Sequence, residues 1–184
     1  MKKLKMNILV ISGPRDIGKT IFCEQIIDIY KSEKVEIKGV ISPGIFLNNQ
    51  KSSISIVDIE SRESKIFATK NPSWYPNFSV KKWIFIEDSI VWANRKLTHA
   101  VPTDLLIIDE LGYLELLDRK GLTNGILAVD SGKYKVALIV IRPELIQAAQ
   151  ARWPDIYVFD IHAENNQKMN RKIIERISAL LEIN

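Results

Sequence analysis

The chain has 184 residues, the length of one average domain, and its longest apolar runs fall well short of the ~20 residues that span a bilayer. Hydrophobic residues make up 46% and charged residues 26%, which excludes a disordered or membrane-embedded chain and predicts a cytoplasmic protein without a membrane partner. The formal net charge is +4 but the lysines are dispersed, so we expect a solvated basic surface and no nucleic-acid partner.

The first predicted elements are a strand, a glycine-rich turn and a helix. Met6–Ser12 is an apolar run, and in Lys19–Lys31 the apolar positions recur at helical spacing. The residues at this spacing are Ile21, Phe22, Gln25, Ile26 and Ile29, of which Gln25 alone is polar. Cys23, the single cysteine, excludes an intrachain disulfide and is interpreted as a small buried side chain in this helix.

An inserted antiparallel segment follows the second strand. Val35–Ser42 is predicted as a strand that Pro43-Gly44 stops, and apolar residues then alternate loosely with polar ones over Ile45–Thr69. We expect a hairpin or meander attached to one edge of the sheet, followed by a loop at Lys70–Phe78. The insert covers approximately 44–78.

The rest of the chain alternates helices with strands. Helices are expected at Glu87–His99 (with Ile90, Val91, Ala93 and Leu97 inward), Thr123–Asp130, Pro143–Trp153 and Asn166–Leu181, and strands at Asp104–Asp109, Lys135–Ile141 and Tyr157–Ile161. Uninterrupted apolar strands that alternate with helices indicate a mostly parallel sheet covered on both faces. The prediction is a single doubly wound α/β domain over 1–184.

The turn between the first strand and helix matches the phosphate-loop pattern G-x-x-x-x-G-K-[ST] in full. Its residues are Gly13, Pro14, Arg15, Asp16, Ile17, Gly18, Lys19 and Thr20. Backbone N–H groups of such a loop surround the β-phosphate, the lysine bridges β- and γ-phosphates, and the threonine hydroxyl ligates Mg²⁺. Arg15 and Asp16 are unusual inside it: the acid pairs with the arginine or faces solvent, and a phosphate contact by Arg15 is the sharper alternative.

Two carboxylates end the strand at Asp104–Asp109. Adjacent acids at the carboxyl end of a buried strand are costly unless a cation is close, and in α/β sheets this end faces the ligand crevice. We therefore expect Asp109 to hold Mg²⁺ together with Thr20. Glu110 is the candidate base that orients the attacking water, while two solvated acids at a turn are the alternative.

Arg142 follows the strand Lys135–Ile141 and so lies at the same rim. Two interpretations stay open: a catalytic guanidinium that stabilises charge on the γ-phosphate, or a surface arginine that pairs with Glu144 or caps a helix.

Four segments together resemble a known family: Gly13–Thr20, Val40–Gly44, Asp109–Leu116 and Glu164-Asn165. They are similar to the small nucleoside-triphosphatases first recognised in hyperthermophiles, which have a human cancer-related relative. The resemblance implies a RecA-like P-loop domain and Mg²⁺-dependent hydrolysis of several nucleoside triphosphates. Tyr113 and Asn166 depart from the family pattern, where lysine and arginine are common.

Two further residues stay open between roles. Glu115 either braces the catalytic loop or is a solvated acid at a helix start, and Asn165 either contacts a base edge or caps the last helix.

Hydrolysis is the favoured function, with a nucleoside or nucleotide kinase and a slow nucleotide-gated binding protein as alternatives. A kinase would use the insert as an acceptor lid, but Ile45–Phe78 holds only one arginine, Arg62. A binding protein would dock a partner, whose identity the sequence leaves unknown, through aromatic residues such as Trp74, Tyr75, Trp83 and Trp92.

Overall fold

The structure is a computed structural model of the chain, and it describes residues 6–73 and 82–183. The strands are β1 (Ile8–Ser12), β2 (Ile37–Ile41), β3 (Gly44–Leu47), β4 (Gln50–Asp58), β5 (Ser64–Lys70), β6 (Trp83–Phe85), β7 (Thr103–Ile108), β8 (Tyr134–Val140) and β9 (Tyr157–Asp160). The helices are α1 (Lys19–Ser32), α2 (Glu87–Thr98), α3 (Tyr113–Leu116), α4 (Thr123–Asp130), the 3₁₀ turn η1 (Pro143–Leu145), α5 (Ile146–Arg152) and α6 (Asn166–Leu181).

One sheet runs through the molecule, in the order β6-β5-β4-β2-β7-β8-β1-β9. The strands from β2 to β9 in this order pair in parallel, and β4, β5 and β6 extend the sheet antiparallel from the β2 edge. A mostly parallel sheet with an antiparallel insert is the predicted architecture. β8 lies between β1 and β7, so the strand before Arg142 separates the phosphate-loop strand from the strand that carries the two acids.

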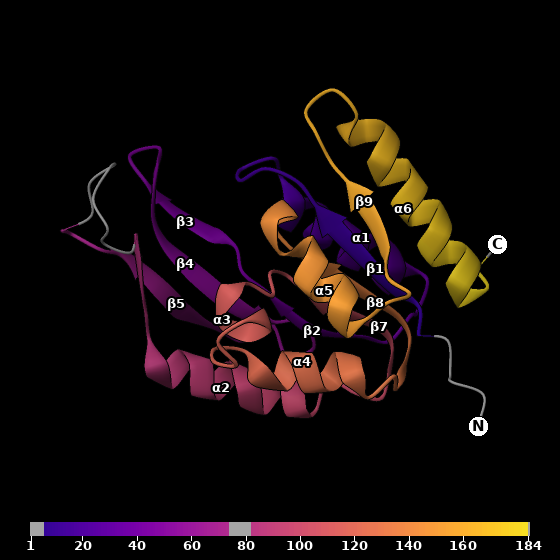
Figure 1. Cartoon of the computed structure of the whole chain (residues 1–184), viewed down its shortest axis with the longest axis horizontal. Coiled ribbons are helices and arrows are strands. Elements are labelled where there is room, and N and C mark those ends of the chain that lie inside the picture. Colours follow the sequence, from indigo (N-terminus) through magenta and orange to yellow (C-terminus); the bar gives the residue numbers. More distant parts are fainter. Residues whose placement is uncertain (1–5, 74–81, 184) are drawn as a thin grey trace.

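The short strand β3 continues the line of β2 beyond the parallel sheet. Both strands pair with the same edge of β4 in one register, since Ile41 opposes Val57 and Gly44 opposes Ile54. Because β2 ends where the loops of the parallel strands begin, β3 extends the insert past that rim (Figure 1).

Helices cover both faces of the sheet (Figure 1). On β7, Leu106 and Ile108 pack with residues of α2, α4 and α5, whereas Leu105 and Ile107 pack with residues of α1 and α6. This alternation follows from the period of two along a strand and explains why β7 is apolar throughout. The doubly wound α/β prediction is therefore confirmed.

Some inward faces and elements were predicted wrongly. Val91, expected inside, is 54% exposed, and in α1 Ile21 is 61% exposed although it lies on the predicted stripe. Cys23 of the same helix is buried, as predicted. Helical spacing identifies an apolar stripe, but the sheet packs only against the part of it that faces inward. The strand β6 and the helix α3 were not anticipated, and Pro143–Trp153 begins as the 3₁₀ turn η1 before α5.

The inserted strands are fastened to the helical layer by Lys96 of α2. Its Nζ lies 2.6 Å from Glu63 Oε2 and 3.5 Å from Asp58 Oδ2. Among the aromatic residues considered for docking, Trp83 and Trp92 are half-buried, and Trp74 and Tyr75 lie outside the described residues. No helix in residues 6–73 or 82–183 is long and apolar enough to cross a bilayer.

Candidate active site

The fold gathers the candidate residues at the carboxyl ends of three neighbouring strands. The phosphate loop follows β1, Arg142 follows β8, and Asp109 and Glu110 follow β7. In doubly wound sheets this edge is where ligands bind. Residues far apart in the sequence therefore share one rim because of strand order alone.

Glycine is required at the start of the phosphate loop. Gly13 has φ 153, and a Cβ there would lie 2.3 Å from the carbonyl oxygen of Ile161, closer than any side chain can approach. Gly18, with φ 93, is the N-cap residue of α1 in the left-handed region. The loop therefore lies between β1 and the segment after β9, and it leads directly into the N-terminus of α1.

Lys19 reaches back across this loop. Its Nζ donates to Gly13 O at 2.8 Å and to Pro14 O at 2.5 Å. Burial lowers the pKa of Lys19, and the charges of Glu110 and Asp109 oppose that shift. The ammonium group therefore lies within the electrostatic reach of both acids.

Asp109 is buried beside Thr20. The carboxylate is 3% exposed, accepts a hydrogen bond from Ser42 N at 3.0 Å and is hydrogen-bonded by the Thr20 side chain. Burial raises its pKa to about 6. A buried carboxylate next to a hydroxyl at a phosphate loop fits Mg²⁺, which uses one or two carboxylates together with waters and substrate phosphates. Within residues 6–73 and 82–183, no group of three or more His, Cys, Asp or Glu side chains is arranged to hold a metal ion.

Glu110 and Arg142 form an ion pair. Arg142 Nε donates to Glu110 Oε1 at 2.5 Å, and Arg142 Nη2 contacts the same oxygen. The sequence left open a local pair between Arg142 and Glu144. In the structure Arg142 instead pairs with Glu110, which follows the neighbouring strand β7. Glu110 has φ 77, a left-handed conformation that a non-glycine residue adopts only when its surroundings hold it.

Glu115 braces the loop after β7. Its carboxylate accepts hydrogen bonds from Gly112 N and Leu122 N, both at 2.8 Å, and burial raises its pKa. A Cβ on Gly112 would lie 3.5 Å from Glu115 Oε2 and 3.9 Å from Glu110 Oε1, so both carboxylates flank this residue. The bracing role left open by the sequence is the one that this geometry supports.

Inside the phosphate loop, Asp16 is exposed as expected, but its partner was not foreseen. Lys51 Nζ of β4 lies 3.1 Å from Asp16 Oδ1, and this hydrogen bond is the main reason why the pKa of Asp16 is lowered. Lys51 belongs to the insert, and no local sequence signal connects it with the loop.

Asn165 is the N-cap residue of α6, but its side chain makes no cap hydrogen bond. It accepts from His162 N at 2.7 Å and donates to Asp160 O at 3.1 Å, which holds the turn between β9 and α6. The next residue, Asn166, donates to Ile17 O at 3.3 Å, so this turn touches the phosphate loop. A base contact by Asn165 stays a prediction.

Comparison with known proteins agrees with this geometry. A family model described as NTPase matches residues 8–174, which include the phosphate loop, both acids and Arg142. The chain belongs to this NTPase family. The sequence resemblance to small nucleoside-triphosphatases is thereby confirmed.

Curated relatives of this family member include two proteins named nucleoside-triphosphatase THEP1. The one from Methanopyrus kandleri is 24% identical over 178 residues, covering 95% of this chain and 97% of the relative. The one from Sulfolobus acidocaldarius is 24% identical over 173 residues, covering 93% and 94%. The solution structure of a human cancer-related nucleoside triphosphatase is similar in fold, with a TM-score of 0.73 at 18% identity, covering 94% of this chain and 98% of the human chain.

Proposed function

We propose that this NTPase-family protein hydrolyses nucleoside triphosphates to diphosphate and phosphate in a Mg²⁺-dependent reaction. The observation behind the proposal is the contact between Thr20, at the end of the phosphate loop, and the buried Asp109 at the end of β7. A hydroxyl and a carboxylate joined beside a phosphate loop are the protein ligands that a Mg·triphosphate needs. The names of the THEP1 relatives support the same reaction class.

The phosphate loop would bind the triphosphate. Its N–H groups and the N-terminus of α1 favour the β-phosphate, and Lys19 is the cation for the β- and γ-phosphate oxygens. Lys19 Nζ donates to two carbonyl oxygens of the loop, Gly13 O and Pro14 O. Phosphate oxygens would take the place of these two acceptors when a triphosphate binds. The lysine is thereby held at the loop before nucleotide arrives.

Thr20 and Asp109 would hold the Mg²⁺ ion, which neutralises charge on the phosphates when bound. Asp109 must be ionised for this, and the charge of Lys19 already lowers its pKa against the effect of burial.

Glu110 is the proposed base. Arg142 contacts its Oε1, so Oε2 can accept a proton from the water that attacks the γ-phosphorus. The new P–O bond forms as the bond to the β-phosphate bridging oxygen breaks, and nucleoside diphosphate leaves. Arg142 holds this carboxylate in place and lies at the rim where charge on the γ-phosphoryl oxygens develops.

Phosphate release from ATP, GTP, CTP and UTP, with Mg²⁺ or with a chelator, tests the proposal. We expect Mg²⁺-dependent release without any acceptor and a decrease of about 10²-fold or more in Glu110→Gln, since the base is lost. The exposed neighbour variant Glu144→Gln is the control and should hydrolyse at the native rate. Diphosphate formation only when a nucleoside or nucleotide is added would assign the protein to the kinases instead.

A further inference from the structure

An acidic side chain inside a phosphate loop is an electrostatic problem. A triphosphate carries several negative charges, and a carboxylate within a Debye length repels them, by more at low salt than at high salt. Asp16 lies at the third variable position of the loop, with φ 58 and a side chain that is 77% exposed. Something must offset this charge if the loop is to bind a polyanion.

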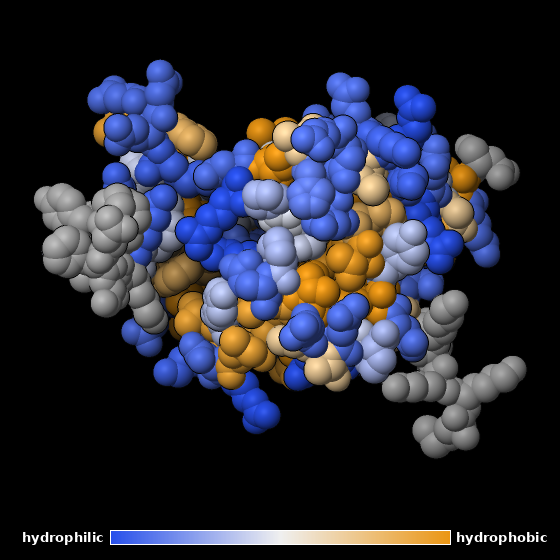
Figure 2. All heavy atoms as spheres, turned by 45° about the horizontal axis from the view of Figure 1, so that its top comes forward, coloured by the Kyte–Doolittle hydropathy of each residue, from blue (hydrophilic) through white to orange (hydrophobic). Residues whose placement is uncertain are grey.

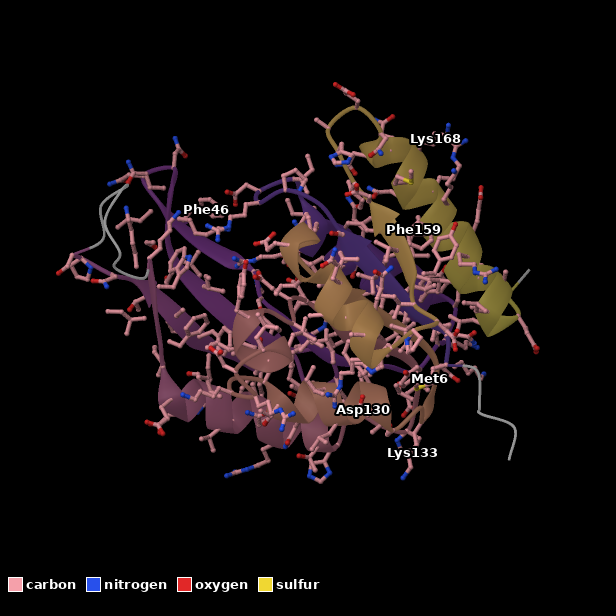
Figure 3. All side chains as sticks on the ribbon, in the orientation of Figure 1. Met6, Phe46, Asp130, Lys133, Phe159 and Lys168 are labelled. Atoms are coloured by element: carbon pink, nitrogen blue, oxygen red, sulfur yellow. The ribbon has the colours of Figure 1, made fainter. Side chains whose placement is uncertain are left out.

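The inserted hairpin provides the offsetting charge. Lys51 Nζ lies 3.1 Å from Asp16 Oδ1, and the Lys51 side chain is only 33% exposed. Its Nζ lies 5.7 Å from the centroid of the Phe46 ring, and a Cβ added to Gly44 would lie 2.5 Å from Lys51 Cε. The aliphatic part of Lys51 therefore packs against β3, and its ammonium group reaches Asp16. In Figure 3, Phe46 marks the side of this hairpin nearest the β1–α1 loop.

The position of the hairpin follows from the sheet. Because β3 continues β2 past the carboxyl end of the parallel strands, its residues stand beside the rim that holds the phosphate loop. Figure 2 shows the projecting end of the insert at the upper left, separated from the body by a hollow whose visible surface is largely hydrophilic. The Lys51–Asp16 contact joins the insert to the phosphate loop at this rim. The charges of Lys82 and Arg15 also act on Asp16, in the same direction as Lys51.

We propose that Lys51 is a positioning residue of the nucleotide site: it neutralises Asp16 and holds that carboxylate outward, so that the inserted hairpin sets the affinity of the phosphate loop for triphosphate. The inference rests on the proposed function only in requiring that triphosphate binds at this loop. Lys51 acts through Asp16, and its effect must therefore disappear when Asp16 carries no charge.

A double-mutant cycle tests this dependence. The dissociation constant of a non-hydrolysable ATP analogue is measured by calorimetry, with Mg²⁺, for the native protein, Lys51→Ala, Asp16→Asn and the double variant. We expect Lys51→Ala to weaken binding about three- to tenfold at low ionic strength, and less at high salt, because the freed carboxylate then repels the phosphates. In the Asp16→Asn background, removal of Lys51 should change affinity by less than about twofold.

Two further variants separate this role from a general loss of charge or structure. Lys51→Arg keeps the positive charge and should bind the analogue with native affinity. Lys65→Ala removes a lysine of the same insert whose Nζ lies over the Trp92 ring, 5.9 Å from its centroid, and it should also bind normally. Hydrolysis measured alongside should show the loss in KM, with kcat little changed.

Equal weakening by Lys51→Ala in both backgrounds would overturn the proposal, because Lys51 would then contact the nucleotide itself or support the fold. Native affinity in Lys51→Ala would overturn it as well. The proposed function fails separately: it fails if the native protein binds neither ATP nor GTP analogues, or if Lys19→Ala binds them as well as the native protein does.

Discussion

Among individual residues, Asp109 shows what the proposed metal site costs in stability. Its carboxylate is buried, and burial raises its pKa from 3.8 to about 6, so the native metal-free chain binds this proton more tightly than the unfolded chain does. The metal-free protein therefore loses stability as pH rises from about 4 through 6, and above that range the loss is about 3 kcal/mol. A cation at Asp109 would remove this cost.

Asp109→Asn should thus stabilise the metal-free protein at neutral pH. The amide oxygen can still accept from Ser42 N, while no buried charge remains. In urea denaturation with a chelator, we expect the variant to be more stable than the native protein by up to about 3 kcal/mol at pH 7.5 and by almost nothing at pH 4. The same variant should lose the Mg²⁺ requirement and Mg·triphosphate affinity together. A variant less stable than the native protein at pH 7.5 would show that the carboxylate is already compensated.

The effect of Arg142 on catalysis can be distinguished from its effect on the stability of the fold. In Arg142→Ala the candidate base loses its partner and the γ-phosphoryl oxygens lose a nearby cation, so we expect kcat to fall by at least about 10²-fold with little change in ATP affinity. The matched control is Arg152→Ala, which breaks an arginine–aspartate pair with Asp130 in the helical layer. Steady-state kinetics and melting curves distinguish the outcomes: a variant that melts earlier but turns over normally would make Arg142 structural.

At the scale of elements, the loop after β7 is held by one half-buried acid, Glu115. Glu115 joins Gly112 N to Leu122 N, and Gly121 leaves space for it: a Cβ on Gly121 would lie 2.1 Å from Glu115 Oε1. Glu110 lies in this loop, two residues before Gly112. The position of the candidate base therefore depends on a contact that is made further along the chain.

Replacing Gly121 by alanine tests this dependence. The added methyl displaces Glu115, and we expect a loss of about 1–3 kcal/mol in unfolding free energy together with a lower kcat. Gly132→Ala is the control, because Gly132 has a similar φ, 62 against 69, but the nearest atoms to its added Cβ are those of Met6, at 3.6 Å or beyond. Equal effects of both substitutions in denaturation and kinetics would mean that backbone strain, and not the Glu115 contact, decides the outcome.

The sequence predicted the elements whose signal is local. The phosphate loop is recognisable because Gly13–Thr20 is one continuous pattern between an apolar strand and a helix. The two acids at the end of β7 are recognisable because they are neighbours in the sequence. The Lys51–Asp16 and Arg142–Glu110 contacts depend on strand order, which no short pattern encodes. The strand β6 was missed because its three residues, Trp83–Phe85, are too few for periodicity to show.

For the molecule as a whole, nucleotide binding and folding are linked. The loops that form the site follow β1, β7 and β8, and they converge only when the sheet is assembled. The unfolded chain therefore has no such site, and any bound nucleotide stabilises the native state by mass action. This linkage provides a test of the phosphate loop that does not depend on catalysis.

We expect Mg²⁺ with a non-hydrolysable ATP analogue, at about 100 times its dissociation constant, to stabilise the native protein by about 2.7 kcal/mol. For a chain of this length that corresponds to an increase in Tm of about 5–10 °C. Lys19→Ala removes the charge-assisted contacts to the β- and γ-phosphates, should weaken binding by about 2 kcal/mol or more, and should lose most of this increase at the same analogue concentration. Lys31→Ala, at the opposite end of α1, keeps the loop intact and should show the full increase. Thermal unfolding of the three proteins with and without analogue decides the matter, because an equal rise in Tm for Lys19→Ala would mean that the nucleotide binds elsewhere.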